Sequence, residues 1–156
     1  MLTQSRWLQP GIKVVTLSRI RTWSVMEAMW GHPLTKIALV TIGGGLGALS
    51  RYGISLLSVR LFGTGFPWGT LLVNLGGCFL IGLSFALADR SSLMNPSARL
   101  FFITGFLGGL TTFSTYGYET FSAIQAGSHW LAMGNILLNN VAGLILVFLG
   151  FRVGNL

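Results

Sequence analysis

The chain has 156 residues, of which 52% are hydrophobic and only 8% are charged. A soluble domain carries about 25% charged residues to keep its surface in water, so this composition excludes an ordinary soluble globular protein and favours one surrounded by lipid. The net charge of +7 comes from ten basic and three acidic residues. These basic residues form no cluster that could follow a phosphate backbone, which argues against nucleic acid as a partner. The single cysteine, Cys78, excludes an intramolecular disulfide.

The first 33 residues differ from the rest. They contain four basic residues, no acidic residue before Glu27, and no apolar run typical of a signal peptide. Three interpretations stay open: a transit-like presequence, an interfacial helix carrying Trp23 and Trp30, or an extension upstream of a true start at Met26 or Met29. We favour a dispensable basic extension at 1–33, followed by a membrane domain at 34–156.

Four apolar stretches lie between the charged residues that follow. A helix needs about 20 mostly apolar residues to cross about 30 Å of hydrocarbon. The candidates are residues 37–59, 61–88 with its core at 68–88, 100–118, and 120–151 with its span at about 130–150. Connections at 60–67, 89–99 and 122–129 are rich in turn residues. The sequence predicts an all-α membrane protein with four transmembrane helices in one domain.

Basic residues in short loops indicate orientation. With four spans, both termini and the 89–99 loop lie on one side of the membrane. That side carries the four cations of the extension and Lys36, Arg90, Arg99 and Arg152, against Arg51 and Arg60 near the other face. The whole chain therefore predicts termini inside. Without the extension the bias shrinks to four against two, which permits insertion either way.

Polar residues recur at helical spacing inside two of the spans. Thr70 and Asn74 lie four residues apart in the second span, and Asn135 and Asn139 do so in the fourth. Polar groups are costly in lipid, so such stripes serve either interhelical hydrogen bonding or transport. The spacing leaves both alternatives open.

The third span combines glycine with hydroxyl residues at membrane depth, between Gly105 and Gly117. We expect this helix to break. Non-helical backbone is tolerated in a membrane where it is buried in protein or lines a cavity, and its freed carbonyls can coordinate an ion. The alternative is close helix packing by small residues.

A glycine pattern in the first span resembles a nucleotide-binding fingerprint. Gly43, Gly45 and Ala48 fit its spacing, but no acidic residue follows until Asp89. The pattern is better interpreted as close helix packing, in which both glycines allow helices to approach.

The chain offers no candidate for catalysis. Glu119 is the only carboxylate that adjoins a span, and no nucleophile and base lie at a recognisable spacing. The lack of an acid deep in the membrane also weighs against a proton-coupled drug antiporter. Arg51 is interpreted as a structural cation that extends to the membrane interface. Neutral Thr, Ser and Asn donors suit an anion better.

Three motifs in order resemble the Fluc, or CrcB, family of fluoride channels over about residues 37–151. They are Gly43-Gly-Gly-x-Gly47-Ala48-x-x-Arg51-Tyr52, Gly69-Thr70-Leu71-x-Val73-Asn74, and Gly105-Phe106-x-Gly108-Gly109-Leu110-Thr111-Thr112-Phe113-Ser114-Thr115. The resemblance implies an antiparallel, dual-topology homodimer in the bacterial inner membrane, with two pores that passively export fluoride and relieve its toxicity. The basic extension fits poorly with balanced insertion, so an oppositely oriented paralogue is the alternative partner.

The resemblance also implies roles for individual residues. Asn74 matches the pore asparagine that donates to fluoride, and Thr70 matches part of the same polar track. Phe113 and position 116 match paired pore aromatics, and Asn135 and Asn139 match polar residues of the fourth helix. Gly108 and Thr111 match the broken helix whose carbonyls, from both subunits, hold a structural Na⁺.

One residue departs from the family pattern. Position 116 is Tyr rather than Phe, which keeps a ring edge and adds a hydroxyl donor, so we expect conduction to survive. Two alternatives remain for the function: a small four-helix multidrug-type transporter and a non-transporting membrane assembly subunit.

Overall fold

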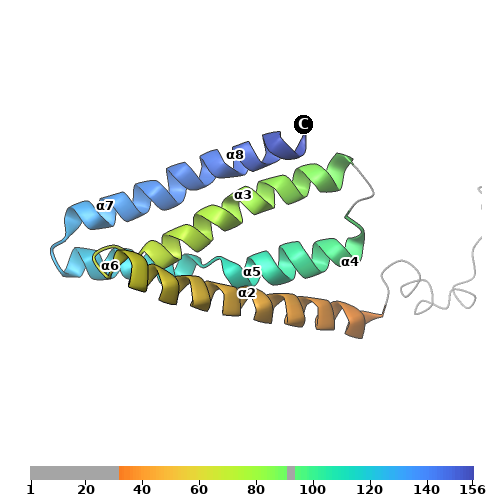
Figure 1. The fold of residues 1–156 in the computed structure, drawn as a ribbon, viewed down its shortest axis with the longest axis horizontal. Helices are drawn as coiled ribbons and strands as arrows, with labels where there is room; N and C mark the ends of the chain where they lie inside the picture. The colour runs from red at the N-terminus through yellow and green to blue at the C-terminus, as the bar shows by residue number, and fades with distance from the viewer. Residues whose placement is uncertain (1–31, 91–93) are drawn as a thin grey trace, which may run out of the picture. The chain divides into compact units, whose positions relative to one another are not determined.

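The computed structural model describes residues 32–90 and 94–156. Residues 1–31 lie outside the described part, and with them most of the expected N-terminal extension. From Leu34 to the C-terminus the chain forms one compact unit, and every regular element described in it is helical (Figure 1). The predicted all-α class is therefore confirmed.

The first two spans are long continuous helices. Helix α2 runs over Pro33–Phe62 and helix α3 over Trp68–Arg90. The start of α3 directly after Pro67 agrees with the sequence, because proline fits a first helical turn where its missing N–H costs nothing. Gly63 lies in the connecting turn with a φ of 74°, a left-handed conformation that strains other residues.

The third span is broken, as predicted. Helix α4 (Pro96–Arg99), the π-helical segment η2 (Leu100–Leu107) and α5 (Gly108–Leu110) lead to the break, and α6 (Phe113–Gln125) follows it. Thr111 (φ −83°, ψ 155°) and Thr112 (φ −151°, ψ 118°) are both extended. Thr112 also caps α6, since its hydroxyl accepts a hydrogen bond from Thr115 N.

The prediction that this span ends at residue 118 was wrong. Helix α6 continues to Gln125, so Glu119 lies inside the helix rather than beside it, and the turn to the next helix is correspondingly shorter. The charged residue is accommodated because its carboxylate accepts a hydrogen bond from α3, described below.

The fourth span is one helical rod. It comprises α7 (His129–Leu137), the π-helical segment η3 (Leu138–Ala142) and α8 (Gly143–Gly154). In the described part of the chain, three helices are long and apolar enough to cross a membrane, at Pro33–Phe62, Trp68–Ala88 and His129–Gly154. The break divides the third span into pieces too short to qualify alone.

Glycines bring these helices into close contact. On α2, a Cβ at Gly43 would overlap Phe101 O and one at Gly47 would overlap Phe106 O, so α2 packs directly against η2 (Figure 1). On α3, Gly82 meets the backbone of α8 at Val147 in the same way. Close packing within the subunit is confirmed for Gly43, whereas the Cβ position of Gly45 has no described atom within 4 Å.

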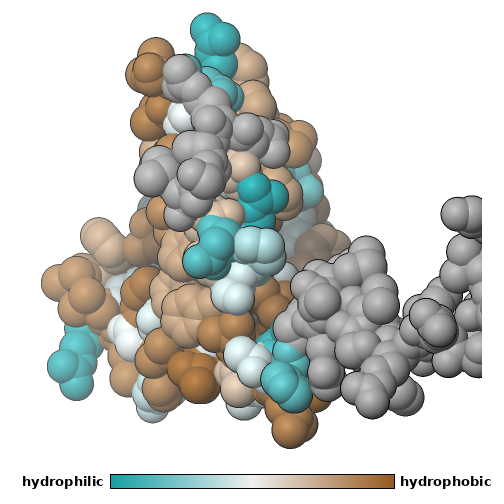
Figure 2. Space-filling model, turned by 90° about the vertical axis from the view of Figure 1, so that its right-hand side faces the viewer, coloured by the Kyte–Doolittle hydropathy of each residue, from teal (hydrophilic) through white to brown (hydrophobic). Residues whose placement is uncertain are grey.

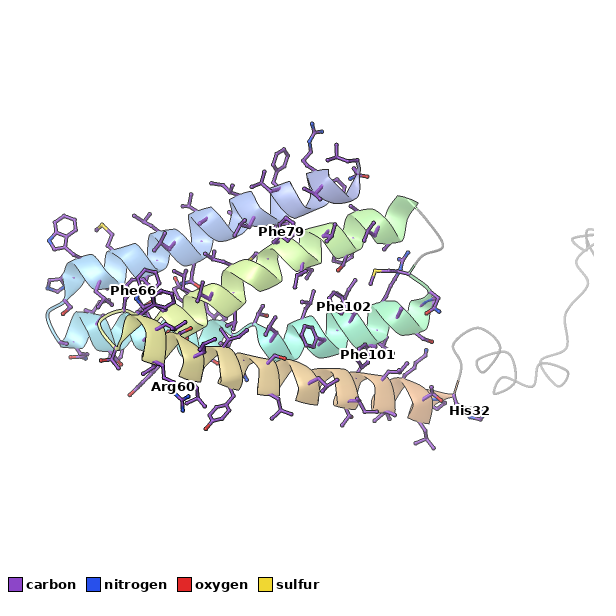
Figure 3. All side chains as sticks on the ribbon, viewed as in Figure 1. His32, Arg60, Phe66, Phe79, Phe101 and Phe102 are labelled. Carbon is purple, nitrogen blue, oxygen red and sulfur yellow. The ribbon has the colours of Figure 1, made fainter. Side chains whose placement is uncertain are left out.

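A small apolar core lies where α3 meets the broken span. Val73, Leu107 and Leu110 are its buried members. Phe102, labelled in Figure 3, packs against them. Its ring stacks on that of Phe106, with centroids 5.5 Å apart. This core holds the break against the second span.

The outer surface is largely apolar. Figure 2 shows hydrophobic side chains over much of the face it displays, with hydrophilic groups in smaller clusters. Large apolar side chains such as Leu49 on α2 (68% exposed) and Leu144 on α8 (73% exposed) point outward. A soluble monomer rarely exposes such a surface, so the protein is a multi-pass membrane protein.

Candidate functional site

The helix break is held by the side chain of Asn74. Its Nδ2 donates to Thr112 O at 3.1 Å, and its Oδ1 accepts from Thr112 N at 2.8 Å. The amide thus supplies the donor and acceptor that an unbroken helix would have given to these backbone groups. Asn74 and Thr112 together form what we call the latch of the break.

A series of hydrogen bonds runs from this latch into the fourth span. Asn74 Nδ2 also donates to Asn139 Oδ1, Asn139 Nδ2 donates to Asn135 Oδ1, and Asn135 Nδ2 donates to Thr120 Oγ1, each at 2.9 Å. Thr120 in turn donates to Tyr116 O at 2.9 Å. Asn135 is fully buried. Asn74 of the first polar stripe therefore joins the Asn135–Asn139 stripe, and the series connects α3 with η3, α7 and α6.

A cavity of about 330 Å³ opens beside the latch. Six site residues predicted from the sequence, on three different spans, line this cavity: Asn74, Gly108, Thr111, Phe113, Tyr116 and Asn139. Thr112 and Asn140 complete its polar and aromatic lining. None of the lining residues is charged. The cavity is therefore an uncharged site in which several polar side chains and two aromatic rings interrupt a largely apolar lining.

The two aromatic residues of the cavity lie edge to face. The ring centroids of Phe113 and Tyr116 are 5.4 Å apart at an interplanar angle of 65°. Phe113 is 80% exposed, whereas Tyr116 is 9% exposed. Ring edges carry partial positive charge, so the pair can face an anion.

Thr70 occupies a different place from Asn74. It is buried and donates to Glu119 Oε1 at 2.7 Å. Both residues line a second cavity of about 470 Å³ near the start of α3, and Glu119 Oε2 is buried there without a partner among the described residues. Among the described residues no hydrogen bond joins Thr70 to the Asn74 series, so the expected polar track is divided between two cavities.

Two residues near these cavities were missed by the sequence prediction. The sequence analysis placed Glu119 at the edge of a span. Thr115 and Ala123, four residues before and after it, belong to the same helix. Asn140 follows Asn139 directly in the sequence, and its Nδ2 donates to Tyr116 Oη at 2.9 Å. Arg51 is half-buried within α2 and lines neither cavity.

The break also exposes backbone carbonyl oxygens that could act as ligands of a metal ion. Where a helix ends, its last carbonyls have no intrahelical partner, and here the chain becomes extended after Leu110. Gly108 adds no side chain to this turn, and no atom of the described residues lies within 4 Å of its Cβ position. Unwound backbone carbonyls are typical ligands of Na⁺ in membrane proteins. The carbonyls from Gly108 to Thr111 therefore fit such an ion by their chemistry.

Comparison with known proteins places the chain in a family. The family profile described as "CrcB-like protein, Camphor Resistance (CrcB)" matches residues 38–151. A relative from Pyrococcus horikoshii is 50% identical over 115 residues, covering 74% of this chain and 92% of its own length. A relative from Dehalococcoides mccartyi is 44% identical over 121 residues, covering 78% of this chain and 93% of its own.

A third relative, from Chloroflexus aurantiacus, is 41% identical over 121 residues, covering 78% of this chain and 96% of its own length. All three relatives bear the name "Fluoride-specific ion channel FluC". The matched region contains all four spans, the latch and both cavities. It begins after the basic extension. The chain belongs to the CrcB family.

Proposed function

We propose that this protein is a channel that lets fluoride leave the cytoplasm passively and so relieves fluoride toxicity. The observation that carries the proposal is the neutral cavity at the helix break, where Asn74, Phe113 and Tyr116 converge. Relatives at 41–50% identity that are named fluoride-specific channels support it. They are channels rather than enzymes, in agreement with the absence of a catalytic arrangement in the sequence.

The composition of the cavity suits fluoride. This anion is small and strongly hydrated, so a selective pore must replace its water with close donors, while binding weakly enough to release it. A fixed cation would hold fluoride too tightly. Amide N–H, hydroxyl and ring-edge groups line this cavity and none of its residues is charged. Fluoride approaching Asn74 would compete with Asn139 Oδ1 for the amide protons, which keeps binding weak.

We propose that a second subunit covers the cavity. Phe113 is 80% exposed although it lies beside buried polar groups, and one four-helix subunit is too small to enclose a complete pore. An antiparallel homodimer with dual topology fits the weak charge bias of 34–156. An oppositely inserted paralogue is the alternative if the basic extension fixes orientation.

The carbonyls of Gly108 and Thr111 are the groups that would hold a structural Na⁺ between two subunits. When bound, the ion would supply positive potential without a mobile side chain. The chain's part is to expose carbonyl oxygens by becoming extended at Thr111 and Thr112. The latch from Asn74 keeps this conformation in place.

Sodium removal tests this site. After exchange from sodium into potassium or N-methylglucamine salts, we expect the melting temperature of the purified protein to fall and fluoride efflux to drop severalfold, because the carbonyl oxygens would lose the cation that the proposal assigns to them. Adding sodium back should restore both. Equal melting temperature and equal efflux in all three salts would show that no sodium site supports the channel.

Reconstitution into liposomes tests the function itself. Vesicles loaded with potassium fluoride and made permeable to potassium should release fluoride to an external electrode far faster than protein-free vesicles, and should retain chloride. Efflux independent of an imposed pH gradient separates a channel from a proton-coupled transporter. Absence of efflux, as expected for an assembly subunit, or equal chloride flux would refute the proposal.

A further inference from the structure

The hydroxyl of Tyr116 has a partner that the family resemblance does not assign. Asn140 Nδ2 donates to Tyr116 Oη at 2.9 Å and to Ile136 O at 2.8 Å. Tyr116 and Asn140 both line the cavity that contains Asn74 and Phe113. The two residues come from different spans, α6 and η3.

The orientation of the Asn140 amide follows from these two contacts. Ile136 O is a carbonyl and can only accept, so the Asn140 atom facing it is the nitrogen. The same nitrogen faces Tyr116 Oη. The phenol oxygen is therefore the acceptor of this bond, and its own proton is left for another group. No described protein group accepts that proton.

We propose that Asn140 is a positioning residue that turns the Tyr116 O–H into the cavity, where it donates a hydrogen bond to the conducted anion. The inference rests on the proposed passage of fluoride through this cavity. It assigns the anion a hydroxyl donor in addition to the ring edges. Fluoride, the smallest halide, gains most from such a donor because charge-assisted O–H bonds are short and strong.

Three variants test the pair. Tyr116→Phe removes the hydroxyl and keeps the ring, so efflux persists, but the fluoride concentration that half-saturates efflux should rise about two- to tenfold, the range for one hydrogen bond. Asn140→Leu should give a similar rise, since the free hydroxyl loses its fixed direction. The double variant should resemble Tyr116→Phe alone, because the two residues act as one unit.

A matched control exists near the end of the same span. Asn155 Nδ2 donates to Phe151 O at 2.9 Å, the same four-residue backbone contact that Asn140 makes, and no aromatic partner is bonded to it among the described residues. Asn155→Leu should leave the half-saturating concentration unchanged. Melting temperatures measured for all variants separate a positioning effect from loss of fold, which would lower stability without a saturation shift.

The outcomes distinguish this inference from the proposed function. If the wild type conducts fluoride but Tyr116→Phe leaves the half-saturating concentration unchanged, or the two substitutions add, the pair does not position a donor. If the wild type conducts no fluoride, the proposed function itself fails. A fall in the half-saturating concentration in Asn140→Leu would also overturn the inference.

Discussion

Asn74→Ala is expected to reduce fluoride efflux about 100-fold or more. The substitution leaves Thr112 N, Thr112 O and Asn139 Oδ1 without their partner. Each polar group left unsatisfied in an apolar environment costs about 1–3 kcal/mol, so the extended conformation at the break loses its support, and the cavity loses its central amide. Efflux from liposomes, measured with a fluoride electrode, checks the prediction.

A hydroxyl residue on the same helix serves as the control. Ser84 also lies on α3 and is buried, but its Oγ donates only to Leu80 O of its own helix. Ser84→Ala should therefore conduct like the wild type. Wild-type efflux in Asn74→Ala, with an unchanged melting temperature, would exclude Asn74 from the pore and from the support of the break.

Gly47→Ala is expected to destabilise the protein by about 1–3 kcal/mol or more, the cost of overpacking a close contact. The added methyl group would overlap Phe106 O and approach Leu110 N to 2.8 Å. These are backbone atoms that cannot rotate away, so α2 must move from η2 and α5. Thermal unfolding followed by size-exclusion chromatography in detergent measures the loss.

Gly45→Ala is the matched control on the same helix. Its Cβ would meet no atom within 4 Å in the described part of the chain, and alanine is a better helix former than glycine by about 1 kcal/mol. The control should therefore be neutral or slightly stabilising in the monomer. Equal melting temperatures for the two variants would mean that α2 does not pack against the broken span as described.

The sequence predicted those parts of the structure that depend on local pattern. The Thr111–Thr112 break followed from glycine and β-branched residues at membrane depth, and the Asn135–Asn139 stripe followed from four-residue spacing. Both depend on neighbours within one or two helical turns. The start of α3 after Pro67 is of the same kind.

Long-range pairing could not be predicted in the same way. Nothing near Asn74 indicates that its amide pairs with Thr112, 38 residues away, and with Asn139, 65 residues away. Glu119 was assigned to a span edge because a charged side chain is costly in lipid, whereas its carboxylate accepts a hydrogen bond from Thr70, 49 residues away. The sequence gives residue types, but the partners are decided by how the helices dock.

The hydrogen bonds between Asn74 and Thr112 constrain the order in which the helices insert and associate. Helices of membrane proteins insert individually before they associate, and each long-range contact must wait for loop closure. Thr112 N has no partner within its own span, so the break cannot be satisfied when that span first enters the bilayer. It is completed only when α3 has docked against this span. The hydrogen-bonded break is therefore formed late in assembly, and an isolated third span should lack it.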